Sequence, residues 1–132
     1  MNYLGIDWGT KKIGLASGND DIKIASPLLF LRVKNLSEAL LRIKQVIEAE
    51  NIGALVVGKP NKLDSANVVS QDWQRFFVEI KNMGLPVFVE DEKMTSILAQ
   101  KMSFELPKKD RNDDVISAVL ILQTFFDGNK QK

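Results

Sequence analysis

Acidic residues stand at three places in the chain where an apolar run ends or begins, and together they could hold a divalent cation. Asp7 ends one such run, Asp91 and Glu92 follow another, and Asp113 and Asp114 precede a third. Carboxylates that converge repel one another and raise one another's pKa unless a cation lies between them. Mg²⁺ and Mn²⁺ prefer such hard oxygen ligands, and two such ions can stabilise the attacking and leaving oxygens of phosphodiester cleavage. The three positions therefore favour metal-dependent cleavage of nucleic acid.

The composition removes most other chemistries. The chain has neither histidine nor cysteine, which excludes the usual zinc ligands, a serine–histidine–aspartate triad and disulfides. Its 132 residues, 45% hydrophobic and 27% charged, are typical of one soluble globular domain, which we expect to span residues 1–132. No apolar run is long enough to cross a membrane, and the N-terminus lacks the pattern of a signal peptide. The net charge of +1 neither favours nor excludes a nucleic-acid partner.

The spacing of apolar residues predicts three strands followed by alternating helices and strands. Residues 4–16 form a hairpin around Gly9, and residues 22–32 form a third extended run that Pro27 interrupts. We then expect helices at about 35–50, 67–83, 95–104 and 112–128, and buried strands at 52–58 and 86–89. Strands joined through helices run parallel, with right-handed crossovers. The fold class is therefore α/β: a five-stranded mixed sheet, made of a three-strand antiparallel meander plus two parallel strands, with helices on both faces.

This topology gives the acidic residues a common edge. The carboxyl ends of parallel strands and the first turns of the helices that follow them share one edge, where open α/β sheets place their sites. Each position also has a purely structural interpretation. Asp7 could cap its turn, Asp91 and Glu92 could belong to a polar loop, and Asp113 and Asp114 could serve the helix dipole. Their shared location is what favours the functional interpretation.

Four segments resemble motifs of the YqgF family, also called RuvX, which are Holliday-junction resolvases with an RNase H-like fold. Residues 5–14 (Gly-Ile-Asp-Trp-Gly-Thr-Lys-Lys-Ile-Gly) resemble its opening hairpin, residues 91–96 (Asp-Glu-Lys-Met-Thr-Ser) its acidic motif, residues 114–123 its last helix, and residues 56–60 (Val-Val-Gly-Lys-Pro) its Val-Gly-Leu-Pro. The resemblance spans nearly the whole chain in the family's order. The chain departs from the family at Lys59, Lys93 and Ser117, where leucine, arginine and alanine are usual. None of these departures falls on an acidic position.

The resemblance implies an RNase H-like domain acting as a cytoplasmic bacterial nuclease that depends on Mg²⁺ or Mn²⁺. In the family this activity is linked to 5′ maturation of pre-16S rRNA and to Holliday junctions. The implied partners are therefore RNA or branched DNA, without a membrane, for a monomer or a homodimer. By motif position the catalytic residues are Asp7, Glu92 and Asp114, and the metal ligands are these three and Asp91. Many RNase H-like nucleases carry an acid at the end of the fourth strand, where this chain has Gly58, so the site depends on the fifth-strand acids.

Lysines fall in the loops beside the proposed edge. We expect nucleic-acid contacts from Lys11, Lys12, Lys59, Lys62 and Lys93, because a basic rim around an acidic centre suits a phosphate backbone. Loop lysines can also serve solubility alone, as they do in most proteins.

Two other functions stay open from the sequence. The chain could be a non-catalytic nucleic-acid binding module in transcription or ribosome assembly, and a metal requirement separates that module from an enzyme. The segment Gly-Ile-Asp-Trp-Gly-Thr at residues 5–10 also resembles the phosphate-binding hairpin of actin-like ATPases and sugar kinases. Those proteins enclose a nucleotide between two such domains, whereas this chain has the length of one.

Overall fold

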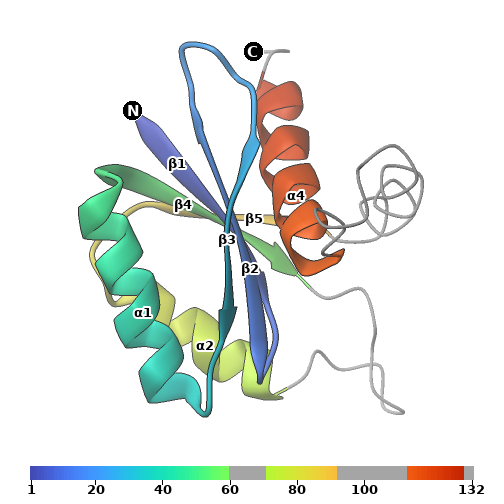
Figure 1. Ribbon diagram of the computed structural model, residues 1–132. Helices are drawn as coiled ribbons and strands as arrows, with labels where there is room; N and C mark the ends of the chain where they lie inside the picture. The colour runs from blue at the N-terminus through green and yellow to red at the C-terminus, as the bar shows by residue number, and fades with distance from the viewer. Residues whose placement is uncertain (60–70, 92–112, 130–132) are drawn as a thin grey trace.

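The computed structural model of the protein describes residues 1–59, 71–91 and 113–129 (Figure 1). Its strands are β1 (Asn2–Trp8), β2 (Lys12–Asn19), β3 (Ser26–Arg32), β4 (Ile52–Lys59) and β5 (Val87–Asp91), and its helices are α1 (Leu36–Ala49), α2 (Gln71–Lys81) and α4 (Asp113–Asn129). The strands form one sheet in the order β3-β2-β1-β4-β5. The β1–β2 and β2–β3 pairs are antiparallel, and the β1–β4 and β4–β5 pairs are parallel. The predicted mixed sheet is therefore confirmed.

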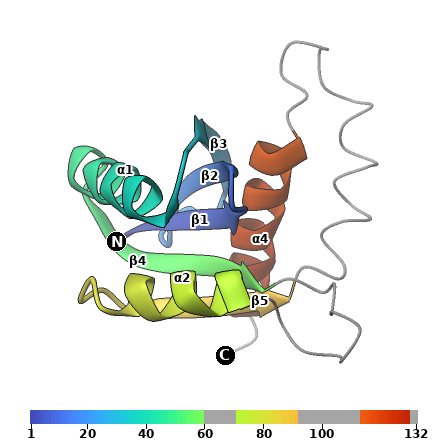
Figure 2. The same cartoon turned by 90° about the horizontal axis from the view of Figure 1, so that it is seen from below.

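The sheet separates two apolar layers. Helices α1 and α2 cover one face and α4 covers the other, as Figure 2 shows. The α1/α2 layer buries alternate residues of the central strands, among them Leu4, Ile6, Leu55 and Val57. The α4 layer buries the residues in between, including Val56 under Phe126 and its neighbours. Because side chains alternate along a strand, this division assigns each position of the sheet to one face.

Two strands differ in extent from the sequence prediction. The third begins at Ser26 and not at residue 22, because residues 20–23 form a turn in which Lys23 has a φ of 62°. The fifth does not end at residue 89 but continues through Glu90 and Asp91, since its pairing with β4 persists there. The start of the second helix near residue 67 and the short helix at 95–104 lie outside the described residues. No helix in the described ranges is long and apolar enough to cross a membrane.

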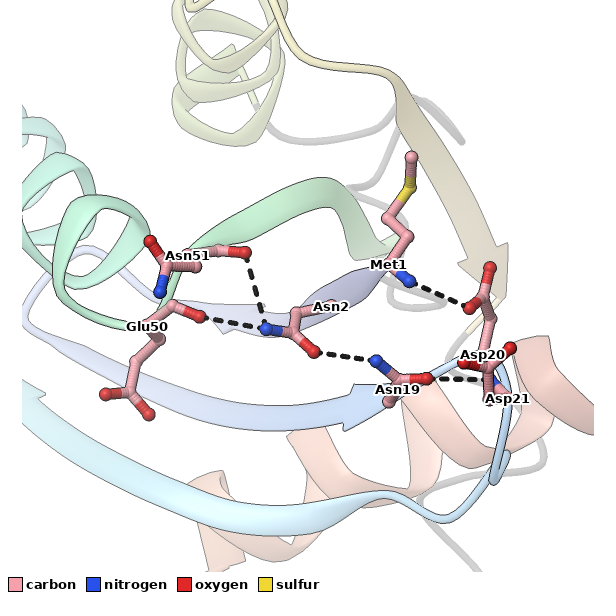
Figure 3. A network of polar contacts seen from close by, with 7 residues as sticks. All are labelled: Met1, Asn2, Asn19, Asp20, Asp21, Glu50 and Asn51. Atoms are coloured by element: carbon pink, nitrogen blue, oxygen red, sulfur yellow. Dashed lines mark hydrogen bonds and ion pairs between the residues drawn. The ribbon is translucent and has the colours of Figure 1, made fainter.

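Side-chain amides form hydrogen bonds between neighbouring elements at the end of the sheet where β1 begins, away from Asp7 (Figure 3). The Asn2 Nδ2 donates to the carbonyl of Glu50 at 3.2 Å, and Asn19 Nδ2 donates to Asn2 Oδ1 at 2.9 Å. The N-terminal ammonium lies 3.1 Å from Asp20 Oδ1. These contacts join the start of β1, the end of β2 and the turn between α1 and β4, so the central strand is anchored at the end opposite the acidic edge.

Helix α4 approaches β1 closely because β1 carries a glycine at the contact. A Cβ atom placed on Gly5 would lie 2.8 Å from Leu122 Cβ and 2.9 Å from the Ala118 carbonyl oxygen, both too close for a real contact. The absence of a side chain at Gly5 therefore sets how close the helix lies to the central strand.

The Gly5→Ala substitution should destabilise the protein, because its methyl group would push against helix backbone that cannot move without displacing α4. Overpacking of this kind costs typically about 1–3 kcal/mol, partly offset by the better strand propensity of alanine. Denaturant unfolding measures the change. Gly128→Ala in α4 is the matched control, because nothing lies within 4 Å of its Cβ position; it should be neutral or stabilising. Equal effects of the two substitutions would contradict the close approach.

Candidate active site

Asp7 lies near the carboxyl end of the central strand, on the face that α4 covers. Its neighbours Ile6 and Trp8 belong to the α1/α2 layer, so strand alternation turns Asp7 with Gly5 to the other side. Asp7 is half-buried. The prediction that this carboxylate belongs to a strand of the sheet, and not to a loose loop, is confirmed.

The strand positions beside Asp7 carry no side chains. Gly14 of β2 pairs with Asp7 directly. On the other side Val57 of β4 pairs with Ile6, so the next residue, Gly58, lies beside Asp7. The Gly58 carbonyl accepts a buried hydrogen bond of 3.0 Å from Trp73 Nε1, which ties the end of β4 to α2. Neither neighbouring strand therefore places a side chain of its own at the level of Asp7.

A second carboxylate shares this face. Glu90 of β5 pairs with Gly58, and two residues earlier Phe88 packs on Phe125 of α4 with ring centroids 4.8 Å apart. Asp7 and Glu90 thus face the same side of the sheet, and only Gly58 of β4 lies between them. Their Cα atoms are two strand spacings apart, or ~10 Å. Burial, and then the negative charge of Asp91, raise the pKa of Glu90 above 4.5. Reasoning from the sequence missed Glu90 as a site residue. The signal that could have found it is its spacing of two residues from Glu92, because residues two apart on a strand share a face.

Asp91 lies on the other face. It pairs with Lys59, is exposed, and shares its face of β5 with Val87, which packs against the α1/α2 layer. The described strand therefore does not bring Asp91 and Asp7 onto one face, and a metal-binding role for Asp91 stays a prediction. Glu92 lies outside the described residues.

Helix α4 begins toward the Asp7 end of β1. Phe126 meets Tyr3, with ring centroids 5.6 Å apart, while Ala118 meets Gly5, so the helix runs antiparallel to β1. Four residues back along the helix is about 6 Å, and two residues forward along the strand is about 6.6 Å. Because Leu122 lies as close to Gly5 as the Ala118 carbonyl does, Asp7 corresponds to helix positions between about 114 and 118, so the acidic start of α4 lies toward the Asp7 end of β1. The prediction that the last helix begins at the two acids is confirmed, since α4 starts at Asp113.

The described residues alone do not form a complete metal site. Within them no three acidic side chains form a cation-binding group. The described part of the site contributes Asp7, with Glu90 two strands away. The predicted catalytic set adds Glu92, which is outside the described ranges, and Asp114, of which the structure describes the backbone.

Basic residues stand on the same edge. Lys11, Lys12 and Lys59 are exposed there, whereas Lys62 and Lys93 lie outside the described residues. Lys12 alternates with buried Ile13 and so shares the face of Gly14 and Asp7, and it pairs directly with Arg32 of β3. Like charges directly opposite each other on adjacent strands are destabilising. An anion bound beside Lys12 and Arg32 would relieve this repulsion. Sequence reasoning missed Arg32, because strand pairing brings it to the edge from 20 positions away in the chain.

Comparison with known proteins gives consistent results. Residues 1–128 match the family model of RuvX, described as a Holliday junction resolvase. A protein of Rickettsia canadensis is 34% identical, over 97% of this chain and 87% of that protein, and one of Rickettsia africae is 31% identical, over 96% and 86%; their names describe them as pre-16S rRNA nucleases.

Solved structures agree on the fold. Thermus thermophilus RuvC in complex with a Holliday junction substrate has a TM-score of 0.68 at 18% identity, covering 98% of this chain and 96% of that one. The fowlpox virus resolvase in complex with Holliday junction DNA has a TM-score of 0.58 at 15% identity, covering 98% and 99%. At these identities the likeness establishes the fold, and the predicted RNase H-like class is confirmed.

The Glu90→Gln substitution should leave the metal-free protein at least as stable as the wild type at neutral pH, since it removes a partly buried charge. A carboxyl group whose pKa is raised on folding stabilises the folded state while it is protonated, and that contribution is lost as the pH rises through the folded pKa. Relative to the variant, the wild type should therefore gain stability as the pH falls toward 4.5 and below. Melting temperatures in chelator across this range test the sign, and a variant that is weaker only at neutral pH would contradict it.

Proposed function

The chain belongs to the RuvX family, and from this premise we propose that it is a divalent-metal-dependent nuclease with its site at the carboxyl end of β1. The placement of Asp7 carries the proposal. This carboxylate lies on the central strand between two glycine positions, on the face covered by α4, and α4 begins with two further acids. An aspartate that only capped a turn would need none of these surroundings.

The donor chemistry fits a hard cation. Without histidine or cysteine in the chain, carboxylates are the available charged ligands, and these suit Mg²⁺ or Mn²⁺. We assign both the ligands and the catalytic roles to Asp7, Glu92 and Asp114. Asp91, predicted as a fourth ligand, lies on the other face of β5 from Asp7. When bound, the ion supplies a polarised phosphoryl oxygen and a bound water of lowered pKa. Glu90 adds negative charge at the outer side of this group.

The basic residues of the edge hold the substrate. Lys12 and Arg32 lie on the face of Asp7, and Lys11 and Lys59 lie along the same edge. Cations so placed neutralise backbone phosphates and position the strand without reading its sequence. Lys62 and Lys93 extend the same role in this proposal.

The proposed substrate is structured nucleic acid in the cytoplasm. The names of the Rickettsia relatives favour pre-16S rRNA, of which we propose the 5′ end as the site of cleavage, and the family description favours Holliday junctions as a second substrate. We propose that a single domain spanning residues 1–132 carries the activity.

The Asp7→Asn substitution should abolish cleavage and leave the fold intact. The amide keeps the size of the side chain but carries no charge for a cation, and metal-assisted catalysis is worth several kcal/mol, so activity should fall by about two orders of magnitude or more. Without metal the variant should be as stable as the wild type or more so, because repulsion among the carboxylates is relieved. Cleavage of a junction and of a 5′-extended rRNA fragment, in Mn²⁺, measures the loss.

Asp21→Asn is the control for that measurement. Asp21 is exposed in the turn after β2, beside the amino end of β1, and its loss should leave cleavage unchanged. Cleavage at the wild-type rate by Asp7→Asn would make Asp7 structural and end the proposal. A wild-type protein that binds both substrates and cuts neither would be the non-catalytic binding module.

Mn²⁺ should raise the melting temperature of the wild type more than that of Asp7→Asn. A ligand that binds only the folded state adds about 2.7 kcal/mol of stability at one hundred times its dissociation constant. Differential scanning fluorimetry with and without Mn²⁺ gives the comparison. Equal shifts for the two proteins would place the cation elsewhere.

A further inference from the structure

A basic pocket lies on the opposite face of the sheet from Asp7, directly behind the acidic edge. It has a volume of about 270 Å³ and is lined by Trp8 and the β1–β2 turn, by the start of α1 and by the first turns of α2. Trp8 follows Asp7 in β1 and stacks on Phe76 of α2 with ring centroids 5.0 Å apart. The pocket and Asp7 are therefore joined by a single peptide unit and open at the same edge.

Three cations line this pocket against one carboxylate. Lys11 comes from the turn, Lys34 precedes α1, and Arg75 comes from α2 together with Asp72. No ion pair engages these three cations among the residues that the structure describes. The backbone keeps the two lysines together, because the Val33 N–H donates to the Lys11 carbonyl at 2.9 Å. Three cations against one carboxylate give the pocket an excess of positive charge, which favours the binding of an anion.

The start of α1 adds hydrogen-bond donors. The first N–H groups of a helix have no partner inside it and carry its positive dipole end. Asn35 Oδ1 accepts from the Glu38 N–H at 2.9 Å, and the Ala39 N–H donates to the Asn35 carbonyl at 3.1 Å. Glu38 turns its carboxylate to the Lys34 N–H at 3.2 Å. Leu36 at the start of α1 lines the pocket, and so does Thr10, whose hydroxyl is a further donor.

The indole of Trp8, which lines the pocket, is a second and independent observation in favour of a bound acceptor. Its indole Nε1 is buried and has no hydrogen-bond partner in the described structure. A buried donor without a partner costs about 1–3 kcal/mol. The other tryptophan, Trp73, satisfies its own Nε1 on the Gly58 carbonyl at 3.0 Å.

We propose that this pocket binds a backbone phosphate of the nucleic-acid strand that is held at Asp7. The inference rests on the proposed function for the identity of the strand. The substrate then contacts both faces of the sheet edge: its scissile region lies on the α4 face, and a neighbouring phosphate lies on the α1/α2 face between Lys34 and Arg75. Two anchors on opposite faces fix the direction of the strand across the β1–β2 turn.

Salt dependence of binding tests the proposal in the Asp7→Asn background, where the substrate stays uncut. The Lys34→Gln/Arg75→Gln pair should lower the slope of log Kd against log salt concentration by about 0.7–0.9, because the pair removes the contact to one phosphate. Arg42→Gln/Lys44→Gln is the matched control, which removes the same charges from α1 outside the pocket. Equal slopes for the two pairs would overturn the inference.

The two indole N–H signals in an ¹H–¹⁵N spectrum distinguish the sources of phosphate. An oligonucleotide should shift the Trp8 signal and leave that of Trp73 in place, and the Lys34→Gln/Arg75→Gln pair should remove the shift. Inorganic phosphate or a mononucleotide at the same phosphate concentration should have little effect. If these small anions shift the Trp8 signal and the oligonucleotide does not, the pocket serves a free ligand and the proposal is wrong.

The two proposals fail separately. If the wild type cleaves and the pocket variants bind like the control, the pocket inference fails while the nuclease proposal stands. If the wild type cleaves nothing and the pocket variants still flatten the salt dependence, the pocket binds nucleic acid in a protein that is not a nuclease.

Discussion

The close approach of α4 to β1 at Gly5 is the constraint on which the site depends. With Leu122 and the Ala118 carbonyl at the place of a Gly5 side chain, the helix lies against the central strand and has its register along it fixed. The amide network at the amino end of β1 fixes that strand from the other side. One helical turn then corresponds to about two strand residues, so the first two turns of α4 lie toward the Asp7 end of β1. Gly5, which has no side chain to react, thus sets how the helix that begins at Asp113 lies along the strand that carries Asp7.

Strand alternation sorts the acidic edge into two faces. Asp7, Gly58 and Glu90 lie on the α4 face, whereas Trp8, Lys59 and Asp91 lie on the other. Because Gly58 has no side chain, nothing from β4 stands between Asp7 and Glu90 on this face. The opposite face at the same edge is basic, with Lys11, Lys34 and Arg75 around a pocket. In this account an acidic, cation-binding face cuts the strand and a cationic face holds it.

Local pattern predicted much of this structure. The apolar runs around Gly9 in 4–16 and the helical spacing of apolar residues in 35–50 predicted these elements and, with the later strands, the mixed sheet. Asp7 was found because an acid ending an apolar strand is conspicuous. Glu90 was missed because the end of β5 depends on its pairing with β4, and Arg32 because it reaches the edge through pairing with Lys12. Which residues pair across two strands depends on the assembled sheet, so this pairing cannot be predicted from the composition of one segment alone.

The central claim is that a divalent cation binds beside Asp7 on the α4 face. Paramagnetic broadening by Mn²⁺ tests it directly in ¹⁵N-labelled protein, because the effect falls steeply with distance from the ion. The account predicts that the amide signals of Gly14 and Gly58, the two neighbours of Asp7, broaden at the lowest Mn²⁺ concentrations, while those of Asn2 and Asn19 at the far end of the sheet persist. Broadening that begins at the exposed acids Asp20 and Asp21, with Gly14 and Gly58 unaffected, would contradict it.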